Sequence, residues 1–159
     1  MLDSKKIETV ESFLSLSMLL EYESADRLRE LSKFMFNHQA KELSELLETL
    51  AGYSDQHASE IRELAEGKVL PELATLTLSW EGLEGPETTA YESVTPQMAV
   101  EDMLQVALRN EIKGQDFYID ISLNSPNEEV RKLAAEFAAE ENDHVTKLQS
   151  WIASREEKT

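Results

Sequence analysis

Four long segments of this 159-residue chain carry apolar residues at alternating intervals of three and four, with almost no glycine or proline inside them. This spacing puts the apolar side chains on one face of an α-helix. We therefore predict helices at about 4–36, 39–66, 96–123 and 126–155. Four amphipathic helices of this length can bury their apolar faces only against one another, so the predicted fold class is all-α, a four-helix bundle.

Residues at the ends of these segments fit helix caps. Asp3 or Ser4 can cap the first helix, and Gly67 follows the end of the second. Ser125 with Glu128 three residues later forms a capping box at the start of the last helix. These signals predict short turns between the first and second helices and between the third and fourth, and therefore two antiparallel hairpins.

The stretch 67–95 is the predicted connection between the hairpins. It contains prolines and glycines, with Leu73–Trp80 predicted as a short helix and Thr95 as the cap of the third long helix. It is long enough to return along the bundle. Two helical hairpins joined by one long crossover have the ferritin-like connectivity, and residues 1–159 are predicted to form a single domain of this kind.

Composition excludes several functions. The 32 acidic and 15 basic residues give a net charge of −17, which repels nucleic acid and attracts cations. The chain has no cysteine, which rules out disulfides, thiolate metal sites and iron–sulfur clusters. No apolar run is long enough to cross a membrane, and the N-terminus is too acidic for a signal peptide, so we expect a cytoplasmic protein without a membrane partner.

The apolar seam of every predicted helix is interrupted near its midpoint by a carboxylate or an imidazole. The midpoints of antiparallel helices meet at one level, so these groups are predicted to converge inside the bundle. Burying carboxylates without partners is expensive, and a metal ion would offset that cost. The candidate metal ligands are Glu21, His57, Glu111, Glu141 and His144.

The spacing of the last two residues supports a metal site. Glu141-x-x-His144 places both side chains on one helix face, one turn apart. Two such Glu-x-x-His motifs, with one Glu from each of two other helices, form the di-iron carboxylate pattern. The second predicted helix supplies His57 but has Ser54 where the second motif requires its Glu.

The two hairpins also resemble repeats of one unit. His57 and His144 are 87 residues apart, and Glu21 and Glu111 are 90 apart. This correspondence favours Glu21 over Glu23 as the ligand from the first helix.

Three segments, 20–27, 107–111 with Phe117–Tyr118, and 134–144, resemble the rubrerythrin-like branch of the ferritin-like superfamily. The last segment, which contains Glu141 and His144, is the most specific part of the resemblance. It implies a non-haem di-iron site in a four-helix bundle, often in a homodimer, with peroxide reduction or ferrous-iron oxidation as the activity. Two iron ions are the expected cofactor, and zinc or manganese are alternatives.

The resemblance also implies which residues share a metal. Glu21 and His57 would hold one ion, Glu111 and His144 would hold the other, and Glu141 would bridge them.

Ser54 removes the second bridge of the family pattern and leaves three functions open. The first is a di-iron oxidoreductase that reacts with peroxide or oxygen and takes electrons from an external donor. The second is a metal-binding protein without turnover, its site weakened by Ser54. The third is a metal-free bundle for protein interaction, which the complete Glu-x-x-His motif disfavours.

Other polar residues are given simpler interpretations. Tyr22, Tyr53 and Tyr118 are predicted to pack or to donate hydrogen bonds to carboxylates. Glu140, next to the candidate bridge, is predicted to lie on the solvated helix surface.

Overall fold

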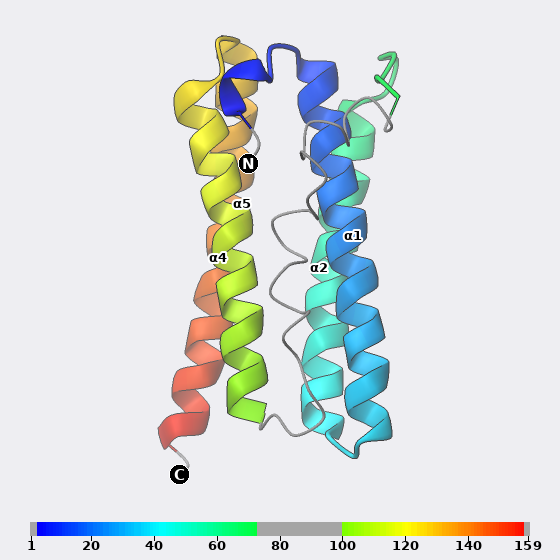
Figure 1. Ribbon diagram of the computed structural model, residues 1–159, viewed down its shortest axis with the longest axis vertical. Helices are drawn as coiled ribbons and strands as arrows, with labels where there is room; N and C mark the ends of the chain where they lie inside the picture. Colours follow the sequence, from blue (N-terminus) through cyan, green and yellow to red (C-terminus); the bar gives the residue numbers. More distant parts are fainter. Residues whose placement is uncertain (1–2, 73–99, 158–159) are drawn as a thin grey trace.

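The structure, a computed structural model, describes residues 3–72 and 100–157 (Figure 1). Within these residues it is an all-α four-helix bundle, which confirms the predicted fold class. The predicted short helix at Leu73–Trp80 and the predicted cap at Thr95 lie outside them. The elements are a short 3-10 helix η1 (Ser4–Lys6) and the α-helices α1 (Val10–Asn37), α2 (Lys41–Leu64), α4 (Val100–Asn124) and α5 (Glu128–Glu157).

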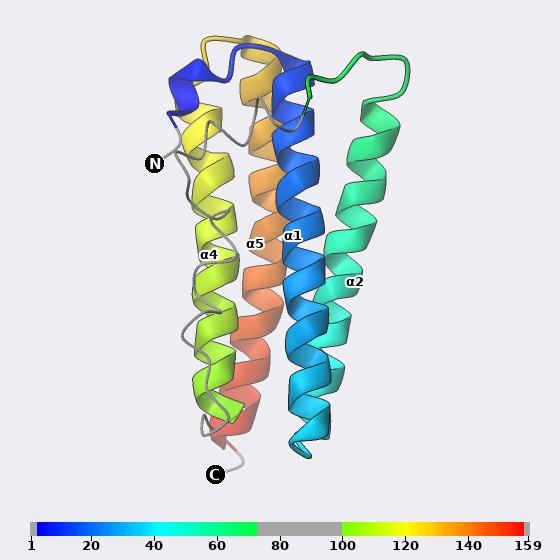
Figure 2. The same ribbon diagram turned by 45° about the vertical axis from the view of Figure 1, so that its right-hand side comes forward.

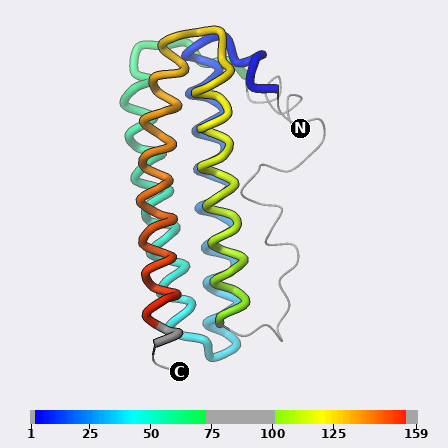
Figure 3. Tube along the Cα trace, turned by 90° about the vertical axis from the view of Figure 1, so that its left-hand side faces the viewer, coloured from blue at the N-terminus to red at the C-terminus, as the bar shows by residue number. Residues whose placement is uncertain are grey.

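The four helices form two antiparallel hairpins that lie side by side. Helices α1 and α2 form one hairpin, and α4 and α5 form the other (Figure 1). Figures 1 and 3 show that the hairpins pack face to face, with α4 beside α1 and α5 beside α2, and Figure 2, turned by 45°, shows all four helices running along the same long axis. Helices α2 and α4 run in the same direction, as two hairpins joined by a long crossover require.

The first helix does not begin at Ser4 as predicted. The Asp3 carboxylate caps η1 by accepting a hydrogen bond of 3.1 Å from the backbone N–H of Lys5. Helix α1 begins only at Val10, where the hydroxyl of Thr9 accepts a hydrogen bond from the backbone N–H of Ser12.

The turn between α4 and α5 explains this interruption. Ser125 Oγ donates a hydrogen bond of 2.6 Å to the carbonyl of Ile7, and Asn127 Nδ2 donates one of 2.9 Å to the carbonyl of Glu8. A continuous helix would use both carbonyls for its own backbone hydrogen bonds. Figure 3 shows the N-terminal segment beside this turn, so these bonds join the two hairpins at one end of the bundle.

The cap of α5 is also different from the prediction. Asn127, not Ser125, caps the helix, because its Oδ1 accepts hydrogen bonds from the N–H groups of Glu129 and Val130, at 2.9 and 3.3 Å. The Ser125 hydroxyl donates to the N-terminal segment instead. The predicted capping box of Ser125 and Glu128 is therefore wrong.

The turn between α1 and α2 contains one residue in the left-handed conformation. Gln39 has a φ of 64°, which ends the helical path and delays the start of α2 to Lys41. At the other end, α2 stops at Leu64, and Gly67 has a φ of 76° that a side chain would strain.

The core consists of two apolar clusters separated by a polar layer, as the interrupted seams predicted. The upper apolar cluster includes Phe13, Leu14, Ile61, Tyr118, Ile121 and Phe137. The lower apolar cluster includes Leu28, Leu47, Leu50, Met103, Leu104 and Leu148. The buried polar residues between them include Glu21, Ser24, Ser54, His57, Glu111 and Glu141.

Candidate metal centre

The structure brings all five candidate ligands together in the polar layer. They form two groups of three residues, and in each group one ligand atom from every residue lies within 4.8 Å of the others. Helices α1, α2 and α5 supply the first group, and α4 and α5 supply the second. The groups are Glu21, His57 and Glu141, and Glu111, Glu141 and His144.

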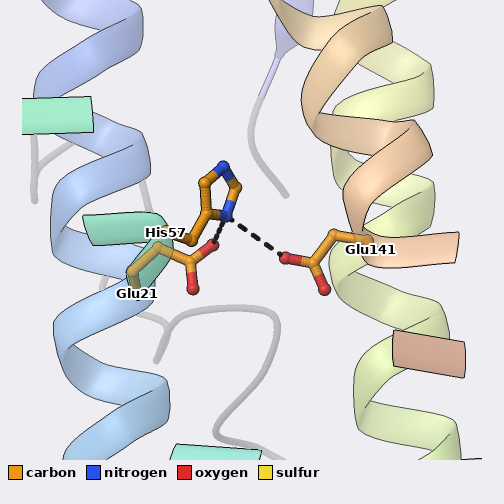
Figure 4. A group of neighbouring side chains, drawn as sticks. All are labelled: Glu21, His57 and Glu141. Atoms are coloured by element: carbon orange, nitrogen blue, oxygen red, sulfur yellow. Dashed lines mark ion pairs between the residues drawn. The ribbon is translucent and has the colours of Figure 1, made fainter. Parts of the chain in front are cut away.

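In the first group, one imidazole nitrogen faces two carboxylates from different hairpins. His57 Nδ1 lies 2.8 Å from Glu21 Oε1 and 3.7 Å from Glu141 Oε1 (Figure 4). The other ring nitrogen points away from both, and it lies 2.9 Å from Glu140 Oε2. Both carboxylates of this group are only 1% exposed, and His57 is 3% exposed.

The second group is more open. His144 Nδ1 lies 3.7 Å from Glu111 Oε2 and 3.5 Å from Glu141 Oε2. The side chain of His144 is 13% exposed, and its ring stacks on Tyr53 with centroids 5.1 Å apart and planes 14° apart. The aromatic stack fixes the plane of the imidazole.

Glu141 is the one residue common to both groups. Its Oε1 faces His57 and its Oε2 faces His144, so one carboxylate lies between the two imidazoles. The grouping agrees with the residue pairs that the rubrerythrin resemblance implied.

Burial changes the acidity of the two outer carboxylates. Burial raises the pKa of Glu21 to about 7, with a further rise from the Glu141 charge and an opposing effect from His57. Burial likewise raises the pKa of Glu111 to about 8, opposed by its contact with His144. In the metal-free protein, both groups therefore titrate near neutral pH.

The three central groups remain charged at neutral pH. Burial disfavours the charged form of Glu141, but its contacts with His144 and His57 outweigh this effect and lower its pKa to about 2. Burial acts against His57 as well, but the carboxylates around it, led by Glu140, raise its pKa to about 12. The pKa of His144 is raised to about 10 because Glu111 and Glu141 outweigh its burial.

Several polar atoms in the layer lack a hydrogen bond of regular geometry. His57 Nδ1 and Nε2 and Glu141 Oε2 are buried without a hydrogen-bond partner, although oppositely charged atoms lie close to them. Buried polar groups are rarely left in this state, and each one requires an explanation. His57 Nδ1 and Glu141 Oε2 each lie close to the other members of a candidate ligand group, which is how metal ligands are arranged, whereas His57 Nε2 points away toward Glu140.

Two neighbouring contacts complete the layer. Tyr118 Oη donates a hydrogen bond of 3.3 Å to Glu21 Oε1, so this tyrosine does orient a carboxylate, one of the roles predicted for it. Ser54 is buried, and its hydroxyl donates to Ser24 Oγ at 3.3 Å. The position where the repeat predicts a second bridging Glu is therefore filled by two short hydroxyl groups.

Sequence reasoning missed Glu140. It was predicted to be solvated, but its side chain is 43% exposed and contacts the buried ring of His57. Glu140 lies off the apolar seam that contains Glu141 and His144, so no local signal in the sequence identifies its contact with His57 on α2. By contrast, Tyr22 is 41% exposed and contacts Arg62, so it takes no part in the centre.

The fold and the centre together define a four-helix-bundle protein with a buried carboxylate and histidine cluster that could hold metal. Its backbone is similar to the crystal structure of the COG1633 uncharacterized conserved protein from Magnetospirillum magnetotacticum MS-1, with a TM-score of 0.73 and 32% sequence identity over 92% of this chain and 95% of that one. At this identity and coverage, the chain belongs to the COG1633 family. No protein-family model and no curated protein sequence matches it.

None of the helices in the described part of the chain is both long enough and apolar enough to span a membrane.

Proposed function

We propose that this protein binds two transition-metal ions, iron in the first place, in the polar layer of its bundle and acts as a di-iron oxidoreductase resembling rubrerythrin. The observation that carries the proposal is the position of Glu141. One buried carboxylate directs its two oxygens toward two separate groups of candidate ligands.

The donor set fits such a centre. It combines three carboxylates with two imidazoles and contains no sulfur, which suits iron, manganese or zinc better than copper. Cations at the two groups would satisfy His57 Nδ1 and Glu141 Oε2, which have no hydrogen bond.

The residues around the centre support metal binding in a further way. A histidine that binds a metal commonly directs its other ring nitrogen at a carboxylate, which fixes the tautomer. Glu140 occupies that position at His57 Nε2. With a metal bound, Glu140 would hold the remaining proton on Nε2, and Nδ1, having lost its own proton, would direct its lone pair toward the group that contains Glu21 and Glu141.

Bound iron would supply redox chemistry with peroxide or oxygen, and the protein would orient the metals and exchange protons. Metal binding must displace the protons held on His57 and His144. It must also displace the protons that Glu21 and Glu111 each carry in part of the molecules near neutral pH. The chain has no cysteine, so this proposal requires an external electron donor.

The alternative is a metal-binding protein without turnover. The observation that favours it is the Ser24–Ser54 hydrogen bond, because a neutral hydroxyl cannot bridge two cations as a carboxylate does. In that case the protein would hold its second ion weakly.

One experiment separates these functions. The purified protein is loaded with ferrous iron under anaerobic conditions, the iron per chain is measured, and the loaded protein is mixed with oxygen or peroxide in the presence of a reductant. Two irons per chain with repeated turnover support the oxidoreductase, and tight binding without turnover supports the alternative. The Glu141→Gln variant should lose iron, whereas Asp116→Asn, an exposed acid on α4, should not. No specific iron binding by the parent protein would refute both functions.

A further inference from the structure

The two candidate histidine ligands are oriented by different kinds of contact. His57 has a carboxylate at each ring nitrogen, because Glu21 lies at Nδ1 and Glu140 lies at Nε2. His144 has carboxylates at Nδ1 alone, and the described part of the chain supplies neither an ion pair nor a hydrogen bond to its Nε2. A histidine that binds a metal is oriented by contacts on its outer side. The orientation of His144 therefore depends on a contact of another kind.

That contact is an aromatic stack from the other hairpin. The ring of Tyr53, on α2, lies nearly parallel to the imidazole of His144, on α5, with centroids 5.1 Å apart and planes 14° apart. Stacking on one face restricts the plane of the imidazole but occupies neither of its nitrogens, which lie at the edge of the ring. Tyr53 can therefore hold this ligand without competing for its donor atom.

Tyr53 is itself held from α5. Lys147 Nζ lies over the tyrosine ring, 4.4 Å from its centroid, in a cation–π contact. Lys147 follows His144 by three residues, so two side chains one turn apart on α5 contact the same ring on α2. The tyrosine is thus tied to the helix that carries the histidine it faces.

The imidazole of His144 has room to turn if this stack is lost. Its side chain is 13% exposed, and together with Tyr53 and Lys147 it lines a pocket of about 250 Å³ between α2 and α5. In the present orientation His144 Nδ1 lies 3.7 Å from Glu111 Oε2 and 3.5 Å from Glu141 Oε2. Rotation of the ring into the pocket would carry Nδ1 away from both carboxylates and break up the second ligand group.

We propose that Tyr53 is a positioning residue for the second metal ion, whose ring holds the His144 imidazole in the plane in which Nδ1 faces Glu111 and Glu141. This inference rests on the proposed function, because it requires a metal ion at that ligand group. Helix α2 supplies one ligand to the first group and none to the second. The tyrosine is then the contribution of α2 to the second ion. Ligands whose orientation is locked by packing bind more tightly, because less freedom is lost when the metal binds.

The test examines each ligand group separately. Glu21→Gln leaves the second group intact, and Glu111→Gln leaves the first group intact. Tyr53→Leu is added to each, and the affinity for Co²⁺ is measured by titration against a competing chelator. In the Glu21→Gln protein, Tyr53→Leu should lower the affinity by about tenfold, within the range for residues that orient a metal ligand. The d–d absorption of the bound Co²⁺ should change as well, because it reports the arrangement of the ligands. In the Glu111→Gln protein, the same substitution should change neither quantity.

Three further variants control for the loss of packing. Tyr53→Phe keeps the stacked ring and should retain the affinity and absorption of the Glu21→Gln protein. Tyr22→Leu is the matched control, because Tyr22 also has a cation over its ring, with Arg62 Cζ 5.6 Å from the centroid, but lies outside the centre. It should leave both quantities unchanged. Tyr53 is only half-buried, so Tyr53→Gln repeats the loss of the ring with a polar side chain if the leucine variant does not fold.

The outcomes distinguish this inference from the proposed function. If the parent protein binds no Co²⁺, the proposed function fails, and this inference fails with it. If the parent binds Co²⁺ but the Glu21→Gln protein does not, or binds it equally well with and without the Tyr53 ring, the positioning role is refuted and the metal centre stands. Equal losses in the Glu21→Gln and Glu111→Gln proteins would indicate a general disturbance of the helix pair and refute the role. A loss in Tyr53→Phe as large as that in Tyr53→Leu would assign the effect to the hydroxyl group and refute the stack.

Discussion

Glu141→Gln tests whether one carboxylate links the two halves of the centre. Glu141 is 1% exposed and remains anionic at neutral pH, because its pKa is about 2. Its oxygens lie 3.7 Å from His57 Nδ1 and 3.5 Å from His144 Nδ1. The amide keeps the shape of the side chain but leaves two buried imidazolium groups without their shared anion.

Removing one partner of a buried ion pair costs about 3–5 kcal/mol. For a chain of this size, about 1 kcal/mol corresponds to about 2–4 °C in melting temperature, so metal-free Glu141→Gln should melt about 6–20 °C below the parent. Glu21→Gln is the matched comparison. The pKa of Glu21 is about 7, so at pH 7 the amide resembles a form that is already populated, and the loss should be much smaller.

Thermal unfolding in the presence of a chelator measures the loss of stability of the metal-free protein, and a titration with ferrous or zinc ions measures the loss of metal binding. Glu141→Gln should lower the affinity for both ions, because it removes a ligand atom from both groups, whereas Glu21→Gln should lower the affinity for one ion. Equal destabilisation by the two substitutions at pH 7 would refute the charge assignment. Equal losses of metal would refute the bridging role.

Three further predictions concern the polar layer and the helix caps. The Ser54→Glu variant should bind the second ion more tightly and oxidise ferrous iron faster, while its metal-free form should melt below the parent because another carboxylate is buried unpaired. Metal stoichiometry, the rate of iron oxidation and the melting temperature measure these effects. An unchanged affinity for the second ion would show that Ser54 is not the missing bridge. The pKa values of Glu21 and Glu111, about 7 and 8, lie above the ordinary value of 4.5 for a glutamate. Both groups therefore bind protons more tightly in the folded state than in the unfolded state. The free energy of unfolding of the metal-free protein should consequently decrease as pH rises from about 4.5 to 8. Denaturant unfolding across this range tests the sign, and a rise in stability would contradict it. Asn127→Ala should cost about 1 kcal/mol, because it removes the cap of α5, and lower the melting temperature by about 2–4 °C, whereas Asn37→Ala, an exposed control, should change it little.

The apolar periodicity was sufficient to predict the helices and the level of the centre. Local spacing reports which face of a helix is buried, and a polar residue in an apolar seam therefore marks a buried polar site. Because antiparallel helices of similar length bring their midpoints to one level, Glu21, His57, Glu111 and Glu141 could be expected to meet. The role of these residues as metal ligands remains a prediction.

Contacts between distant segments decided the rest. Glu140 has no unusual local spacing, and only the packing of α5 against α2 brings it within 2.9 Å of His57. Similarly, Ser125 is a good local cap, but its hydroxyl donates to Ile7, 118 residues earlier in the chain, and Asn127 caps α5 instead. A local sequence motif carries no information on partners that are distant in the chain, because a hydrogen bond depends on the positions of both the donor and the acceptor. Periodicity thus determines which faces are buried, and tertiary packing determines which atoms meet.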